Sequence, residues 1–177
     1  MDTINGFPAI ADKQAKILIL GSMPSDSSLQ QQRYYAHQRN AFWPIMFSLF
    51  NHNLEISDYP LRQQLLIKNQ VAVWDVLQSC HRSGSLDTAI KMNTIQVNQF
   101  YDFFSKHNLI KQVFFNGTKA ETIYMKNVLA QVSAEFAYLN YTRLPSTSPA
   151  HASLNLNQKT KIWHDEIRYI IKATRNK

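Results

Sequence analysis

Residues 17–46 read "ILILGSMPSDSSLQQQRYYAHQRNAFWPIM", and this stretch decides which fold the chain can adopt. It begins with four apolar residues, 17–20, the pattern of a short strand that is buried on both faces. Gly21 ends the run, and the tight turn "GSMPS" follows. Next come tyrosines, a histidine, an arginine, an asparagine and a Phe-Trp pair, a mixture that a hydrophobic core does not require. A buried strand that opens into such residues is typical of a binding site at the carboxyl edge of a parallel sheet.

Short apolar runs alternate with helical patterns along the rest of the chain. The expected strands cover residues 16–20, 70–74, 112–115 and 135–139. The expected helices cover residues 42–50, 60–69, 93–107, 118–130 and 157–174. This alternation predicts an α/β fold, a three-layer sandwich around a central, mainly parallel four-stranded sheet. Because no repeat, low-complexity run or linker divides the chain, we expect residues 1–177 to form a single domain.

The net charge of +7 is unevenly distributed. Residues 1–88 hold seven Lys and Arg against seven Asp and Glu, whereas residues 89–177 hold twelve against five. This asymmetry indicates a polyanionic partner, DNA or RNA, although many basic proteins bind neither. The single cysteine, Cys80, excludes an internal disulfide and favours a reducing compartment, so we expect a cytoplasmic protein. We expect no membrane span and no secretion signal, because no apolar run approaches ~18 residues and the N-terminus lacks a basic-then-apolar pattern.

Several common catalytic motifs are missing from the sequence. The chain has four glycines, and "GSMPS" matches neither the dinucleotide-binding fingerprint nor the Walker loop. No second cysteine accompanies Cys80 to build a zinc site, and there is no nucleophile elbow. A nucleophilic Cys80 beside His81 is one interpretation, and an inert buried cysteine is the commoner one. We therefore expect neither a metal nor an organic cofactor.

Four polar segments follow the expected strands and should meet at one edge of the sheet. They are "GSMPS" with "RYYAHQRNAFW", "VAVWDVLQSCHRSGSLD", "VFFNGTKA" and "RLPSTSPAHA". Aromatic side chains stack on bases, amides and carboxylates read base edges, and hydroxyl-rich loops hold phosphates. Together the segments predict a site for a nucleic acid.

The same segments resemble the uracil-DNA glycosylase superfamily, especially its mismatch-specific thymine/uracil branch. That branch has "GINPG" after its first strand and then a stretch close to "FAHPANRFW", and this chain has "GSMPS" and "YAHQRNAFW" in the same order. "LPSTSPAHA" stands where the family has "NPSGLS" or "HPSPLS". Within the superfamily the chain is most similar to the hypoxanthine-DNA (deoxyinosine) glycosylase group. The resemblance implies a repair enzyme that flips a deaminated base, with hypoxanthine from deoxyinosine as the expected one, and hydrolyses its N-glycosidic bond to leave an abasic site.

The chain departs from the superfamily at Met23. Most members have an Asp or Asn there that places the attacking water, and methionine has no proton chemistry. Either another residue places the water or the protein is inactive. In the hypoxanthine group the Asn of the "RN-FW" motif is implicated, which makes Asn40 the expected catalytic residue. Its amide oxygen can hold a water in line, and it can also cap the helix that follows.

Five residues are expected to contact the base. Tyr35 matches the aromatic residue that stacks on the flipped base, and its alternative role is that of a core or rim tyrosine. Asp75 could accept the N1–H of hypoxanthine, or it could cap a helix. Asn116 and the backbone N–H groups of Ser22 and Met23 could stabilise the departing purine anion, although Asn116 also suits a turn.

The loop "LPSTSPAHA" is expected to enter the minor groove and to support the extruded nucleotide. The family's second motif often begins with His or Asn, whereas this chain has Leu144 there. The expected DNA contacts are Pro145, Ser146, Thr147, Ser148 and His151. An ordinary surface turn is the alternative.

Two other functions remain open on the sequence alone. One is a uracil or G·T/U mismatch glycosylase of the same fold, and the other is a nucleic-acid-binding module in which Met23 marks lost catalysis. No lysine stands out as a Schiff-base nucleophile, so we expect a monofunctional glycosylase without a lyase step. We expect it to act on DNA as a monomer.

Overall fold

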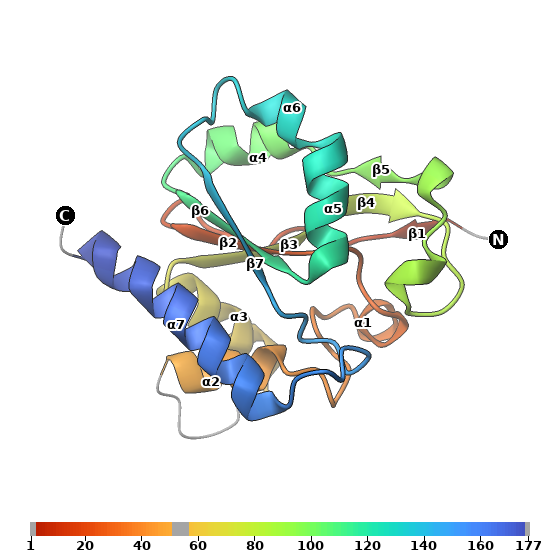
Figure 1. The fold of residues 1–177 in the computed structure, drawn as a ribbon, viewed down its shortest axis with the longest axis horizontal. Helices are drawn as coiled ribbons and strands as arrows, with labels where there is room; N and C mark the ends of the chain where they lie inside the picture. Colours follow the sequence, from red (N-terminus) through yellow and green to blue (C-terminus); the bar gives the residue numbers. More distant parts are fainter. Residues whose placement is uncertain (1–2, 51–56, 176–177) are drawn as a thin grey trace.

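The computed structural model describes residues 3–50 and 57–175, with side chains up to residue 170. At its centre is a four-stranded sheet with the strand order β3-β2-β6-β7, in which all neighbours are parallel. Its strands are β2 (Ile17–Gly21), β3 (Val71–Asp75), β6 (Gln112–Asn116) and β7 (Asn140–Leu144). Helices cover both faces (Figure 1), which is why β2 consists of buried residues throughout. The predicted α/β sandwich is confirmed.

The two helical layers divide the core in two. One face carries α4 (Phe100–Lys106), α5 (Thr118–Asn127) and α6 (Leu129–Val132) (Figure 1). The other carries α2 (Phe42–Leu49), α3 (Tyr59–Lys68) and α7 (Leu156–Arg175). Because side chains alternate along a strand, Leu18 and Leu20 pack toward α4 and α5, whereas Ile17 and Ile19 pack toward α2 and α7.

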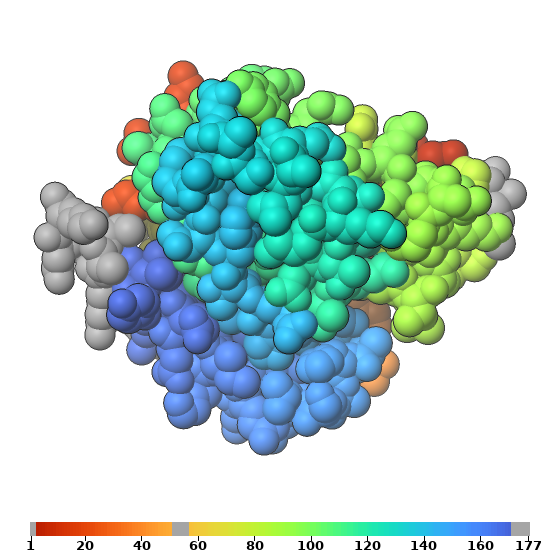
Figure 2. Space-filling view, turned by 45° about the horizontal axis from the view of Figure 1, so that its top comes forward, coloured from red at the N-terminus to blue at the C-terminus, as the bar shows by residue number. Residues whose placement is uncertain are grey.

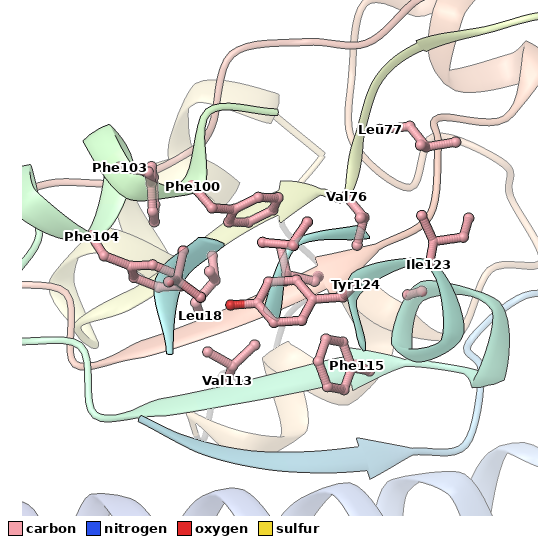
Figure 3. Close-up of a cluster of buried hydrophobic side chains, with 14 of the residues drawn as sticks. Leu18, Val76, Leu77, Phe100, Phe103, Phe104, Val113, Phe115, Ile123 and Tyr124 are labelled. Atoms are coloured by element: carbon pink, nitrogen blue, oxygen red, sulfur yellow. The ribbon is translucent and has the colours of Figure 1, made fainter. Parts of the chain in front are cut away.

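The α4–α5 face is a closed aromatic core. Rings from these two helices rest on β2 and β6 (Figure 3), and Phe100 meets Tyr124 edge to face with 5.1 Å between ring centroids. Each such side chain, once removed from water, stabilises the fold by about 1.5–3 kcal/mol. The polar residues at the ends of the strands lie at the sheet edge and on the other face.

A second, small sheet corrects the prediction of a helix over residues 93–107. Its antiparallel strands are β1 (Ile4–Asn5), β4 (Leu77–Cys80) and β5 (Gln96–Val97), in the order β1-β4-β5. Residues Met92–Thr94 form a 3-10 turn, and α4 begins only at Phe100. Gln96 and Val97 pair with β4 as a strand, and this long-range pairing overrides the local helical spacing.

The strand expected at residues 135–139 is also wrong. These residues form turns, and the fourth strand is β7, which pairs from Gln112↔Asn140 to Asn116↔Leu144. Phe136 and Leu139 are buried, but they fill the α4–α6 core from a loop. The expected helix over residues 118–130 is divided into α5 and α6 at Val128. The helices expected at residues 42–50, 60–69 and 157–174 are confirmed within a residue at each end.

Candidate active site

The carboxyl edge of the sheet brings side chains from three neighbouring strands together. β3 ends at Asp75, β2 at Gly21 and β6 at Asn116, and Gly21 lies directly opposite Asp75 in the ladder. The strand order puts Gly21 in the middle. The alternation of side chains puts all three residues on the α2–α7 face. Because Gly21 has no side chain, a place over the central strand is left for the side chains of its neighbours.

Asp75 and Tyr35 both reach this place. A Cβ atom at Gly21 would lie 2.3 Å from Asp75 Oδ1 and 3.5 Å from the Tyr35 hydroxyl oxygen, so the two groups converge over the glycine. Tyr35 has a φ of 55°, a left-handed conformation that is uncommon for a bulky residue. Its ring stacks on Phe42 with 3.9 Å between centroids and 20° between planes. One face of the Tyr35 ring is therefore occupied by the protein itself.

The two converging groups are buried and lack hydrogen-bond partners among the described residues. Asp75 is 4% exposed, and neither its Oδ2 atom nor the Tyr35 hydroxyl is paired. Burial, and then the Asp87 charge, raises the pKa of Asp75 to about 8 against the opposing effect of Arg82. Burial and Asp75 also raise the pKa of Tyr35, whereas the nearby Asn116 amide lowers it. The Tyr35 hydroxyl and the Asn116 side chain do not form a hydrogen bond. Unsatisfied buried groups of this kind are rare and mark a candidate site for a polar ligand.

The role of Asp75 as a helix cap is wrong, because the residues that follow it form strand β4 rather than a helix. Its backbone carbonyl accepts a hydrogen bond from the Asn98 side chain at 2.8 Å. The carboxyl group of Asp75 therefore does not cap a helix.

Asn116 connects the sheet edge to the loop after β7. Its Nδ2 donates to Thr147 Oγ1 at 2.8 Å, and its Oδ1 accepts from the Thr147 N–H at 2.8 Å. The Thr147 carbonyl in turn accepts from the Ala41 N–H at 3.0 Å. Thr147 is 1% exposed, so its hydroxyl serves inside the protein and is not available to a phosphate in this conformation.

The loop of residues 145–151 is held from two sides. A Cβ at Gly117, whose φ is 97°, would lie 2.9 Å from Ser146 Cβ, so the glycine permits the close approach. Lys159 is 4% exposed, and its ammonium donates to the carbonyls of Ser148 and His151 at 3.2 and 2.8 Å. Pro145, Ser146, Ser148 and His151 remain half-buried at the surface. A loop ordered in advance loses less entropy when it binds.

Asn40 lies one residue before Ala41, the N-cap of α2, and faces a cavity. Its Oδ1 accepts from the Phe42 N–H at 3.0 Å, and no described residue accepts from its amide nitrogen. Asn40 lines a cavity of about 300 Å³ together with Arg39, His151 and Lys159. Tyr35, Asp75 and Asn116 do not line it. The hydrogen bond between Ala41 and Thr147 links this cavity to Asn116.

The side chain of Met23 is turned away from the site. It is buried in the α4–α5 core with Leu18 and Leu20, whereas Asp75 and Asn116 lie on the other face. Ser22 is also buried, and its hydroxyl donates to Asp87 Oδ1 at 2.6 Å. The backbone N–H groups of Ser22 and Met23 have no acceptor among the described residues, although both residues are buried.

Sequence reasoning missed Asp87, Arg82 and Lys159. The "GSLD" motif contains Asp87 and could have drawn attention to it, but nothing local distinguishes Lys159 from an exposed helical lysine. Cys80 is fully buried in β4, and burial raises the pKa of its thiol, as befits an inert cysteine.

Three segments that follow strands of the sheet lie near one another on the surface. In Figure 2 the yellow-green segment of residues 80–95 lies at the right and the blue loop after β7 at the bottom, with atoms of the orange segment after β2 between them. Over residues 3–50 and 57–175, no helix is long and apolar enough to cross a membrane. The same residues contain no group of three or more His, Cys, Asp or Glu that could hold a metal ion.

Comparison with known proteins gives one consistent picture. The family model described as "Uracil DNA glycosylase superfamily" matches residues 7–167. A protein of Methanosarcina acetivorans described as "Hypoxanthine DNA glycosylase" is 36% identical over 164 residues, which cover 93% of this chain and 98% of the relative. One of Methanosarcina barkeri with the same description is 37% identical over 115 residues, 65% of this chain and 72% of the relative. A solution NMR structure of a Methanosarcina acetivorans protein, provisionally described as a uracil DNA glycosylase, has a TM-score of 0.77 at 30% identity and covers 95% of this chain and 98% of its own.

Proposed function

The chain belongs to the uracil DNA glycosylase superfamily and is a DNA glycosylase, and we propose that its substrate is deoxyinosine, from which it releases hypoxanthine. The relatives described as hypoxanthine DNA glycosylases support this substrate, since one of them is similar over almost the full length of both chains.

The observation that carries the proposal is the buried carboxyl group of Asp75 over Gly21, whose Oδ2 atom has no hydrogen-bond partner among the described residues. With its pKa raised to about 8, most of this group holds its proton at neutral pH. A neutral carboxyl group presents an O–H donor beside a C=O acceptor. Hypoxanthine presents an N1–H donor beside an O6 acceptor, so its edge is complementary to the donor and acceptor pattern of the neutral carboxyl group. An ionised carboxylate offers only acceptors and would meet O6 with repulsion.

Asn116 supplies the discrimination against adenine. The Thr147 N–H can only donate, so the Asn116 oxygen must face it and the nitrogen must lie on the Thr147 hydroxyl side. The second hydrogen of that nitrogen can be donated to a carbonyl oxygen such as O6. The exocyclic amino group of adenine has no comparable acceptor, and this contact would be lost.

Asn40 is the proposed water-positioning residue, because no side chain at Met23 can hold water on this face. Asn40→Ala should lower kcat about 100-fold while DNA affinity stays within a few-fold, since only positioning is removed. Gln38→Ala is the matched control, because Gln38 is an exposed residue of the same cavity wall.

The test of the substrate is a strand-cleavage assay on labelled oligonucleotides, followed by alkali to cut abasic sites. The panel contains single- and double-stranded DNA with one deoxyinosine, one deoxyuridine or one G·T mismatch. Cleavage confined to deoxyinosine supports the proposal. Cleavage mainly at uracil or at the mismatch would show a uracil or mismatch glycosylase instead. Tight binding without cleavage would show a nucleic-acid-binding module.

We propose further that the reaction stops at the abasic site. Lys159 is the lysine of the Asn40 cavity, and burial lowers its pKa, but its ammonium is committed to two backbone carbonyls. Borohydride treatment during turnover should trap no protein–DNA adduct. An adduct that disappears in Lys159→Gln would establish a lyase step and overturn this part.

A further inference from the structure

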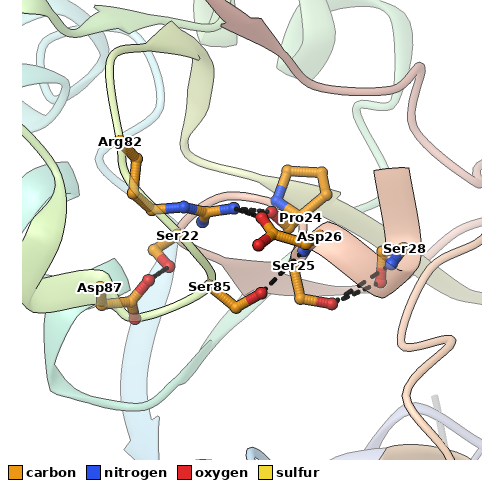
Figure 4. Close-up of polar contacts among 8 residues, drawn as sticks. All are labelled: Ser22, Pro24, Ser25, Asp26, Ser28, Arg82, Ser85 and Asp87. Carbon is orange, nitrogen blue, oxygen red and sulfur yellow. Dashed lines mark hydrogen bonds and ion pairs between the residues drawn. The ribbon is translucent and has the colours of Figure 1, made fainter. Parts of the chain in front are cut away.

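The segment of residues 82–87 lies against the turn that follows β2 (Figure 4). We propose that Asp87 is a positioning residue of the base site: together with Arg82 it holds residues 21–26 in place, and its charge acts on the carboxyl group of Asp75. The inference rests on the proposed reading of the base by Asp75.

Two hydrogen bonds fasten the turn to this segment. Ser22 Oγ donates to Asp87 Oδ1 at 2.6 Å, and the Asp26 N–H donates to Ser85 Oγ at 2.9 Å. Ser22 directly follows Gly21, the residue over which Asp75 and Tyr35 converge. A shift at Asp87 is therefore passed through one hydrogen bond to the floor of the candidate site.

Arg82 is the third attachment. Its fully buried side chain donates through Nη2 to the Pro24 carbonyl at 2.6 Å and lies 3.4 Å from Asp26 Oδ1. Its Nε and Nη1 atoms have no partner among the described residues. A buried guanidinium with unpaired donors is costly for stability, so a role in the electrostatics of the site accounts for it better than a role in folding.

Asp87 and Arg82 are the charged groups that act on Asp75. The other titratable groups around it, Tyr34, Tyr35 and Tyr59, all have raised pKa values and stay neutral. The negative charge of Asp87 disfavours ionisation of Asp75, and Arg82 favours it.

The proton belongs to Asp75 rather than to Asp87. Burial raises the pKa of both carboxyl groups, but the Ser22 hydroxyl, Arg82 and Lys119 all lower that of Asp87. Asp75 has only Arg82 to favour its charged form. Of two neighbouring carboxyl groups, the one with more donors ionises first and leaves the proton on the other.

Asp87→Asn separates charge from shape, because the asparagine oxygen can still accept from Ser22. In the free protein, ¹³C NMR of labelled carboxyl groups should show the Asp75 titration moving to lower pH by about one unit. The alkaline limb of kcat/KM for base excision should move by the same amount in the same direction. Arg82→Met should move both to higher pH.

Asp102→Asn is the control, since Asp102 is an exposed acid of α4, and it should move neither profile. Equal loss of activity at every pH, with an unmoved Asp75 titration, would overturn the inference and leave Asp87 a structural residue. The titration needs no substrate. If the wild type fails to release hypoxanthine but the Asp75 titration shifts in Asp87→Asn, the proposed substrate falls and the control by Asp87 stands.

Discussion

At the scale of single residues, the candidate site depends on a glycine, Gly21, which has no side chain. Gly21 is where Asp75 Oδ1 and the Tyr35 hydroxyl meet, and a methyl group there would lie 2.3 Å from the carboxyl oxygen. Because that oxygen ends a flexible side chain, it can move aside at small cost to the fold. The base-reading edge would move with it.

Gly21→Ala should therefore keep the thermal stability within a few degrees and lower kcat/KM on deoxyinosine about 100-fold. Thermal denaturation and single-turnover excision check the two halves. Full activity in this variant would mean that the place over Gly21 does not receive the base.

The protonation of Asp75 predicts how activity depends on pH. The neutral form is present below the pKa of about 8 and is lost as the pH rises through it, so excision should decline on the alkaline side. Asp75→Asn offers the same donor and acceptor without a proton to lose. A pH–rate profile of this variant should keep activity within about tenfold of wild type at pH 7 and show no decline near pH 8. A wild-type rate that rises through this range contradicts the assignment.

The sequence names Asp75, Asn116 and Asn40 because each is close to an apolar run or to a family motif. It does not reveal the work of Asp87, since the contact with Ser22 joins residues 65 positions apart. It also does not reveal that Thr147 is buried. Nothing in the sequence distinguishes Thr147 from the two serines beside it, and only the structure shows that Asn116 binds its hydroxyl.

At the scale of elements, the loop after β7 acts as a clamp between β6 and α2. Thr147 joins Asn116 on one side and Ala41 on the other. The loop thus connects the Asn116 amide, the proposed base contact, to Ala41 beside Asn40.

Thr147→Val removes the hydroxyl and leaves Asn116 Nδ2 without its acceptor. The free energy of unfolding should fall by about 1–2 kcal/mol, and KM should rise several-fold because the loop and the amide lose their fixed orientation. Denaturant unfolding and steady-state kinetics measure both. Thr122→Val, an exposed threonine of α5, is the control and should change neither. A variant as stable and as active as wild type would contradict the clamp.

The sequence predicts the positions of strands correctly where nearly every residue of the strand is buried. It predicts them wrongly where most of a strand is partly exposed. β2 and β6 are apolar runs, and their expected positions are close to those observed. β7 lies at the edge of the sheet, and its residues are partly exposed and mostly polar. The turn before it is more apolar, so the sequence predicts the strand at the turn. The small antiparallel sheet depends on pairing between distant segments, which no local pattern encodes.

At the scale of the whole molecule, the site is maintained at the expense of stability. A carboxyl group whose pKa is raised on folding makes the folded state bind more protons than the unfolded state between about pH 4 and 8. The contribution of Asp75 to stability is therefore fully present below the unfolded pKa and is lost as the pH rises through the folded one.

Asp75→Asn should consequently be more stable than wild type at pH 8.5, by an amount on the order of a few kcal/mol, and much closer to it at pH 4. Thermal denaturation of both proteins at the two pH values gives the comparison. An equal difference at both values would show that Asp75 has no shifted titration.

Release of free hypoxanthine is the most direct test that this chain excises hypoxanthine with Asn40 as its catalytic residue. Mass spectrometry would follow the release over time from a duplex with a single deoxyinosine, for wild type and for Asn40→Ala. We expect one hypoxanthine per duplex with an unbroken abasic strand, and release slowed about 100-fold in the variant. Bound duplex with no free hypoxanthine would contradict the assigned substrate, and an unchanged rate in Asn40→Ala would contradict the assigned catalytic residue.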